Sequence, residues 1–281
     1  TYATILSHLD RRDEAEREVR AAGDGLSATL GSRHPHSITA RASLATLLFT
    51  QGDVDPAIQI CREILEVKRE IYGHRHPRTV RELAQLASML STTGDHDEAM
   101  ELVEQAYQIE GEHLGLAHPD TLSTANTIGM TSAAMGDHER AAQFYRTAYE
   151  GRAEVLGDAH PNTLISLRNL VGQLTVLGRY TEAANLAEVL VATAEATLPE
   201  GHRHLAIFRL ERGRTCMHLD RFQEAESDLL AAHDTLIAML PEDHRFVLLA
   251  RESLHTLYMK WHADKPNSGH KESAESWKPA S

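Results

Sequence analysis

The chain has 281 residues, of which 42% are hydrophobic and 25% are charged, and its formal net charge is −13. These values are ordinary for a soluble globular protein. The acidic balance argues against a nucleic-acid binder or a protein held on an anionic membrane, because both need clustered Lys and Arg. No apolar run approaches the roughly 20 residues of a membrane span. The two distant cysteines, Cys61 and Cys216, make no disulfide framework, so we expect a cytoplasmic protein in a reducing compartment.

A short motif recurs along the chain at a spacing of 42 residues. One copy reads LGDAHPNTL, from Leu156 to Leu164. Its histidine falls at six positions, of which the last two lack the following proline: His34, His76, His118, His160, His202 and His244. A period of 20–50 residues is typical of a solenoid built from stacked repeats.

Each repeat predicts two antiparallel helices. Proline suits the first turn of a helix, and the nearby Thr or Ser can satisfy a free backbone N–H there. Apolar residues follow at helical spacing, as at Leu164, Leu167 and Leu170, until a glycine such as Gly178 ends the first helix. A small residue, Ala183, then lets the second helix approach closely. We interpret the periodic histidine as a structural residue that contacts a free carbonyl at the helix end.

We therefore predict an all-α fold, a right-handed α-α superhelix in which stacked helix pairs bury their apolar faces. The expected domain is one solenoid over residues 1–262. It would have a partial repeat at 1–33, repeats that start near 34, 76, 118, 160 and 202, and a terminal helix at 243–262. Within the partial repeat, residues 1–9 are interpreted as the remnant of a first helix. The polar segment 263–281 is expected to be a frayed tail, with one short helix around Trp277.

The segment NTIGMTSAAMGDHERAAQFYRTAYE, from Asn126 to Glu150, resembles the core of a tetratricopeptide repeat. It has an apolar-small pair, a Gly-Asp turn, and alanines early and late in the second helix. The 42-residue spacing and the LG-x-x-HP-x-T connection resemble the kinesin-light-chain type of this repeat, in its bacterial form. Two positions depart from the pattern, because Arg212 replaces a usual Leu and Val171 replaces a usual small residue. We expect altered packing at the fourth and fifth repeats.

The resemblance implies that the first helices line a concave groove that binds a peptide segment of a partner protein. On this sequence the groove residues would be Arg81, Ser123, Asn126, Arg168 and Arg214, with Asn169 beside them. In the family, Asn at such positions clamps the peptide backbone, and Arg can bind carboxylates in a two-pronged manner.

The formal charge differs between the two kinds of helix. The six 17-residue windows that begin at the periodic histidines together carry +7, and the rest of the chain carries −20. This segregation favours a peptide with acidic groups as the ligand. The alternative is that acidic second helices only keep the outside of the protein soluble.

The sequence contains no catalytic motif such as G-x-S-x-G, H-E-x-x-H or a Gly-rich phosphate loop. One histidine per layer is too widely spaced for a shared zinc ion, because packed helices lie roughly 8–10 Å apart. We therefore expect no enzyme, cofactor or metal site, and a protein-interaction scaffold as the function. Because the chain begins without Met inside a helical pattern, the alternative is the C-terminal regulatory arm of a larger signalling protein. Such a protein could be a serine/threonine kinase or a transcription regulator.

Overall fold

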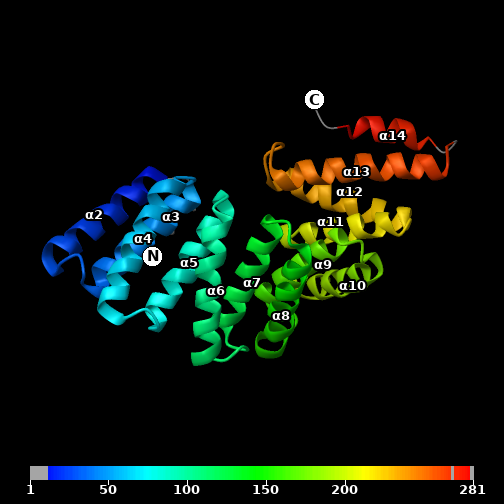
Figure 1. Ribbon diagram of the computed structural model, residues 1–281. Coiled ribbons are helices and arrows are strands. Elements are labelled where there is room, and N and C mark those ends of the chain that lie inside the picture. Colours follow the sequence, from blue (N-terminus) through cyan, green and yellow to red (C-terminus); the bar gives the residue numbers. More distant parts are fainter. Residues whose placement is uncertain (1–11, 267–268, 279–281) are drawn as a thin grey trace. The chain divides into compact units, whose positions relative to one another are not determined.

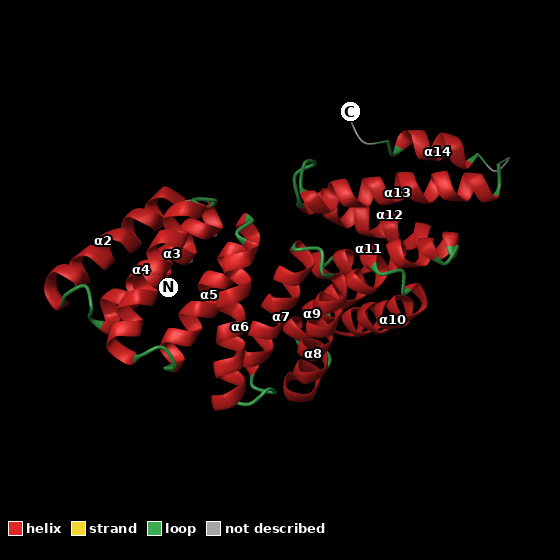
Figure 2. Ribbon diagram, in the orientation of Figure 1, coloured by secondary structure: helices red, strands yellow, loops and turns green. Residues whose placement is uncertain are grey.

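The computed structural model describes residues 12–266 and 269–278, and within these ranges every regular element is a helix (Figures 1 and 2). The chain divides into two compact units, residues 1–137 and 138–281. The first unit contains α2 (Arg12–Leu30), α3 (Pro35–Gln51), α4 (Val54–Tyr72), α5 (Pro77–Thr93), α6 (His96–His113) and α7 (Pro119–Ala134). The second contains α8 (His138–Leu156), α9 (Pro161–Val176), α10 (Tyr180–Thr197), α11 (Arg203–His218), α12 (Phe222–Met239), α13 (Arg245–Asp264) and α14 (His270–Ser276). The helix remnant expected at residues 1–9 lies outside the described residues.

Inside each unit, consecutive helices pack against one another. The first helices of successive repeats are also neighbours, because α5 contacts α7 in the first unit and α11 contacts α9 and α13 in the second. Each unit is therefore a stack of helix pairs, with first helices on one face and second helices on the other. The predicted all-α fold and tetratricopeptide superhelix are confirmed, whereas the single domain over residues 1–262 stays a prediction.

Small residues at one register position allow the helices of a pair to approach. The alanines that recur every 42 residues in the second helices are all fully buried: Ala57, Ala99, Ala141, Ala183 and Ala225. Large aliphatic side chains of the first helices, such as Leu86 and Leu170, fill the space beside them and are at most 1% exposed. This alternation of small and large side chains forms the core of each unit.

The expected change in packing at the fifth repeat is an ion pair. Arg212 of α11 donates two hydrogen bonds of 2.6 Å to the buried carboxylate of Asp228 on α12. One repeat earlier the same two positions hold Leu170 and Leu186, so a charged pair has replaced an apolar one. The other unusual residue, Val171, is fully buried in α9.

The turns inside the repeats need a left-handed backbone conformation. Gly178, which follows α9, has φ 74°, as the predicted helix end requires. The equivalent residue after α11 is Asp220, which adopts φ 56° and is the only non-glycine residue with positive φ in the described part of the chain. Asp tolerates this region better than most side chains, so the turn is kept without glycine.

The periodic histidines cap the N-termini of the first helices. The Nδ1 atom of His160 accepts a hydrogen bond of 3.2 Å from the backbone N–H of Asn162, and the other five histidines make the same contact at 3.1–3.3 Å. In this repeat the Thr163 hydroxyl donates to the carbonyl oxygen of Gly157, the residue after α8, at 2.9 Å. The predicted carbonyl partner of the histidines was therefore wrong, and at this repeat the predicted roles of His160 and Thr163 are exchanged. The reason is geometric, because Nδ1 of a histidine is as many bonds from Cα as Oδ1 of an asparagine, a favoured capping atom.

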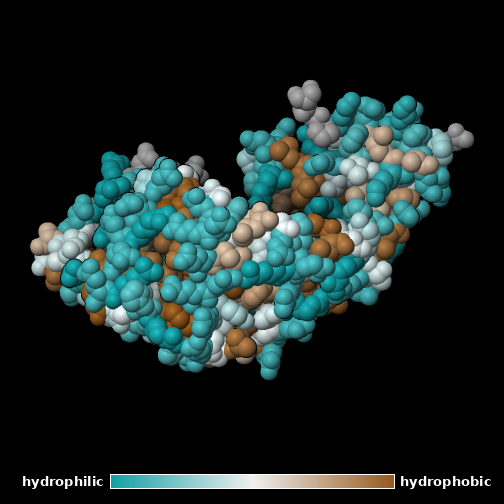
Figure 3. Space-filling model, in the orientation of Figure 1, coloured by the Kyte–Doolittle hydropathy of each residue, from teal (hydrophilic) through white to brown (hydrophobic). Residues whose placement is uncertain are grey.

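The chain end continues past the predicted terminal helix. The short helix α14 packs against α13, and His255 Nδ1 lies 2.8 Å from the carbonyl oxygen of Ala274. The ring of Trp277 stands edge-on to His233 of α12. No helix in the described ranges has the length and apolar character needed to cross a membrane. The face shown in Figure 3 is mainly hydrophilic, with apolar groups in separate patches.

Candidate functional site

A pocket lies on the first-helix face of each unit. The pocket of the first unit lies between α5, α6 and α7 and has a volume of about 220 Å³. Its lining is largely polar: Arg81, Ala84, Gln85, Glu110, Asp120, Ser123, Thr124 and Thr127. Two of the predicted groove residues, Arg81 and Ser123, are thus brought together here, while Asn126 lies half-buried on α7 outside the lining.

Acidic groups determine the chemistry of this first pocket. The guanidinium of Arg81 lies 3.9 Å from the Asp120 carboxylate, and both side chains are more than half exposed. Glu110 reaches the pocket from α6 and is only 6% exposed. Its Oε2 atom is buried and has no hydrogen-bond partner among the residues that the structure describes. Burial raises the pKa of Glu110, whereas the hydrogen bond with the Thr124 hydroxyl lowers it.

The pocket of the second unit lies between α9, α11 and α13 and has a volume of about 230 Å³. Its lining combines aliphatic and aromatic groups with cationic ones: Ile165, Arg168, Arg203, His204, Ile207, Phe208, His244 and Phe246. Burial and, secondarily, the neighbouring cationic groups, among them Arg203 and Arg168, lower the pKa of His204. Arg168 and Arg203 give this pocket its permanent positive charge.

Three predicted groove residues meet beside this second pocket. Arg168 donates a 2.5 Å hydrogen bond to Oδ1 of Asn169, and its guanidinium lies 3.8 Å from the carboxylate of Glu211. Arg214 donates to the same carboxylate at 3.1 Å. Sequence reasoning missed Glu211, which is buried and partly neutralises both arginines. A ligand carboxylate would have to compete with it.

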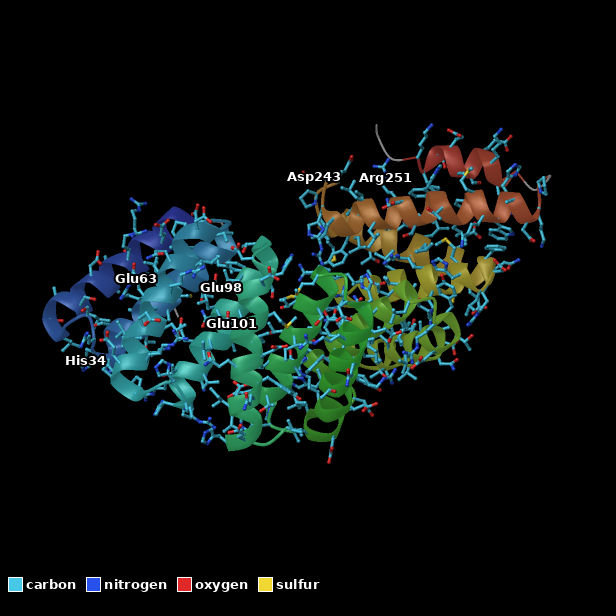
Figure 4. All side chains as sticks on the ribbon, in the orientation of Figure 1. His34, Glu63, Glu98, Glu101, Asp243 and Arg251 are labelled. Atoms are coloured by element: carbon cyan, nitrogen blue, oxygen red, sulfur yellow. The ribbon has the colours of Figure 1, made fainter. Side chains whose placement is uncertain are left out.

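The charge segregation also differs between the units. The first-helix windows of the first unit together carry +1, and those of the second unit carry +6. Acidic side chains instead gather on second helices, as Figure 4 shows for Glu63 of α4 and for Glu98 and Glu101 of α6. Arg62 of α4 binds both carboxylate oxygens of Glu98, at 2.6 and 2.7 Å. The second unit therefore has the stronger cationic character on its first-helix face.

The histidine and cysteine side chains are further candidates, as metal ligands and nucleophiles, among the described residues. In the part of the chain that is described, no group of three His, Cys, Asp or Glu side chains could hold a metal ion. Both cysteines are buried and unpaired. Burial, with a smaller contribution from the neighbouring Glu82, raises the pKa of the Cys61 thiol to about 12, so the reactive thiolate is suppressed at neutral pH.

Solved structures with the same fold come from several proteins. A putative kinesin light chain from Podospora anserina with nearly identical TPR-like repeats matches at 24% identity and a TM-score of 0.64, covering 72% of this chain and 96% of its own. BtubC (BKLC) from P. vanneervenii matches at 20% identity and a TM-score of 0.69, covering 83% and 95%. A Rap protein complexed with competence and sporulation factor matches at 14% identity and a TM-score of 0.62, covering 94% and 77%. No curated protein sequence matches the chain.

The family model of the tetratricopeptide repeat matches residues 39–109 and 120–196, which together make up more than half of the chain. The matched segments contain two of the six capping histidines, His76 and His160, and His118 lies in the gap between the segments. This repeat is generally a non-catalytic interaction fold. The expected resemblance is confirmed, and the chain belongs to the tetratricopeptide repeat family.

Proposed function

We propose that this chain is a non-enzymatic scaffold that binds a peptide segment of a partner protein on its first-helix faces. The observation that carries the proposal is the second-unit pocket, in which an aromatic and aliphatic floor adjoins Arg168 and Arg203. Such a pocket can bury one apolar side chain of a peptide, while guanidinium groups bind carboxylates beside it. The preferred ligand of this unit is a peptide with an apolar anchor next to acidic residues.

The remaining predicted groove residues take secondary roles in this proposal. Arg214 and Asn169 orient Arg168 through Glu211 and through a direct hydrogen bond. Arg81, Ser123 and Asn126 contribute polar contacts on the face of the first unit. A bound peptide or protein partner is supported by the Rap structure, which has the same fold and is a complex with competence and sporulation factor. The two unpaired cysteines support a cytoplasmic location.

The test begins with a displayed peptide library selected against the full chain. The affinity of the strongest peptide is then measured by fluorescence polarisation for the chain and for two charge-reversal variants. Arg168→Glu alters the second-unit pocket, and Arg146→Glu makes the same charge change on α8, where Arg146 pairs with Glu182 of α10 at 2.5 Å. Circular dichroism verifies that both variants fold.

We expect Arg168→Glu to weaken peptide binding at least tenfold and Arg146→Glu to change it less than twofold. Replacing the acidic residues of the peptide by their amides should weaken binding to the unmodified chain in the same direction. Equal affinities of the two variants would show that the second-unit pocket is not the binding site.

A further inference from the structure

One pair of register positions carries a different polar contact in successive repeats. The positions lie 42 residues apart in the second helices, at Lys68, Glu110 and Arg152, and in the first helices that follow, at Glu82, Thr124 and Ser166. All the second-helix members except Lys68 are at most 6% exposed, and the first-helix members are at most 2% exposed. These positions allow one buried contact to be compared across repeats.

The first of these contacts is an ion pair through one carboxylate oxygen, and Glu82 Oε1, like Glu110 Oε2, is buried without a hydrogen-bond partner among the described residues. Lys68 Nζ of α4 lies 2.7 Å from Glu82 Oε2 of α5, and both side chains are largely buried. Two repeats later, Arg152 of α8 donates hydrogen bonds to the Ser166 hydroxyl at 2.6 Å and to the Asn162 carbonyl oxygen at 3.1 Å. In both places the buried cation meets oxygen acceptors that the neighbouring first helix supplies.

Glu110 is the exception in this series, because it places a carboxylate where the other two repeats place a cation. The Thr124 hydroxyl makes one hydrogen bond with Glu110, but Glu110 Oε2 is buried without a partner among the described residues. A buried carboxylate oxygen without a partner is costly to a fold. Glu110 also lines the first-unit pocket, beside Asp120 and Ser123.

We propose that the first-unit pocket binds a primary ammonium group, namely the side chain of a lysine in the bound partner segment. This inference rests on the proposed function, since the lysine belongs to the same bound peptide segment. The ligand would give Glu110 the contact that Lys68 gives Glu82 inside the chain. The pocket contains two carboxylates and the single guanidinium of Arg81. One further cation would therefore balance its formal charges.

The acceptors of this pocket suit an ammonium better than a guanidinium. An ammonium is a compact charge with three donors on a slender, flexible stem, whereas a guanidinium is a planar fork that requires two coplanar acceptors. Glu110 is the buried acidic residue of the lining, and Asp120 and Thr127 are its more accessible oxygen-bearing residues.

The experiment uses two small probes and the full chain. The first probe is Nα-acetyl-lysine N-methylamide, and the second is the same molecule with its ε-amine acetylated. Binding is followed through the backbone amide signals of Gly111, Thr124 and Thr127 in two-dimensional ¹H–¹⁵N NMR spectra. We expect saturable shifts with the free amine and at least tenfold weaker binding of the acetylated probe.

Two variants locate the contact. Glu110→Gln keeps the shape of the side chain and removes its charge, so it should weaken binding of the amine at least tenfold. Glu101→Gln makes the same change at an exposed position of α6 (Figure 4) and should leave the affinity unchanged. Equal binding of the two probes, or equal affinities of the two variants, would overturn the inference.

A repeat graft provides a second test that does not depend on the folding of one variant. The double variant Glu110→Lys with Thr124→Glu copies the Lys68–Glu82 pair into the next repeat, so an internal ammonium should occupy the pocket. We expect the amine probe to lose its saturable shifts. The graft leaves the second unit unchanged, and binding of a library peptide that depends on Arg168 would support the proposed function even if the amine probe failed to bind.

Discussion

The two units share one repeating frame but differ in the chemistry of their first-helix faces. At one register position the first unit has Glu82 and Thr124, whereas the second has Ser166 and then Phe208. Phe208 lines the aromatic pocket, and the threonine serves the buried Glu110 in the polar one. Capping histidines and helix lengths are nearly constant in both units. The repeating helix pairs therefore fix the position of each side chain. Single substitutions at these positions determine what each first-helix face can bind.

The largest test of this comparison concerns the Arg212–Asp228 pair of the second unit. The first unit has Leu86 and Leu102 at the same positions. Replacing Arg212 by Leu leaves the carboxylate of Asp228, which is only 5% exposed, without its bidentate partner. Removing one member of a buried ion pair costs about 3–5 kcal/mol. We expect that loss in the free energy of unfolding, measured by urea denaturation.

The double variant Arg212→Leu with Asp228→Leu gives the second unit the apolar pair of the first. Buried ion pairs replaced by apolar residues of similar volume often leave stability unchanged or raise it by about 1–4 kcal/mol. We expect recovery to at least the stability of the unmodified chain. If the double variant is as unstable as the single one, the charged pair is required by the second unit and the frames are not interchangeable.

A smaller effect is expected where the units balance side-chain volume differently. The second unit combines Gly213 with Leu229, whereas the first combines Ala87 with Val103 at the same positions. A Cβ atom on Gly213 would lie 2.8 Å from Leu229 Cγ and 3.2 Å from the carbonyl oxygen of Ala225. Overpacking costs about 1–3 kcal/mol, and a gain of about 1 kcal/mol in helix propensity offsets part of it. Gly213→Ala should therefore lower the unfolding free energy by up to about 2 kcal/mol.

Two further variants separate crowding from helix propensity. Gly172 also lies inside a helix, but a Cβ atom there meets nothing within 4 Å, so Gly172→Ala should stabilise the chain by about 0.5–1 kcal/mol. Adding Leu229→Val to Gly213→Ala copies the first unit and should restore part of the loss, although it removes one methylene from the core. Destabilisation by Gly172→Ala would show that helix propensity is misjudged and that crowding is not the cause at Gly213.

The repeat of helix pairs could be predicted from the sequence because it depends on residues that recur at a fixed spacing. The glycine turns and the buried alanines are tied to fixed backbone geometry, so their spacing alone gives the helix pairs. The departure at Arg212 was visible for the same reason, but its partner Asp228 was not, since nothing in a single repeat marks a carboxylate as buried. Comparing register positions across repeats would have drawn attention to Glu110, which stands where Lys68 and Arg152 stand.

The polar contacts of the faces were less predictable. Arg168 and Arg214 were expected to await a ligand, and in the structure both interact with Glu211. Glu211 lies between them in sequence, three residues before Arg214, so helical spacing was the available signal. The exchange of capping roles between His160 and Thr163 had no signal in the residue types, because either side chain can accept or donate a hydrogen bond. These assignments depend on rotamers, which a one-dimensional pattern does not contain.

The smallest expected loss of stability tests whether the repeat pattern is the same in both units. His76 caps α5 in the first unit and His160 caps α9 in the second, through the same contact from Nδ1 to a backbone N–H. Loss of a side-chain cap costs about 1 kcal/mol. We expect His76→Ala and His160→Ala to lower the unfolding free energy equally, by about that amount. Asparagine at either position should keep most of the stability, because its Oδ1 can occupy the place of Nδ1. A cap that matters in one unit alone would show that the two helix starts are held by different contacts, and the shared histidine would then no longer define a common frame.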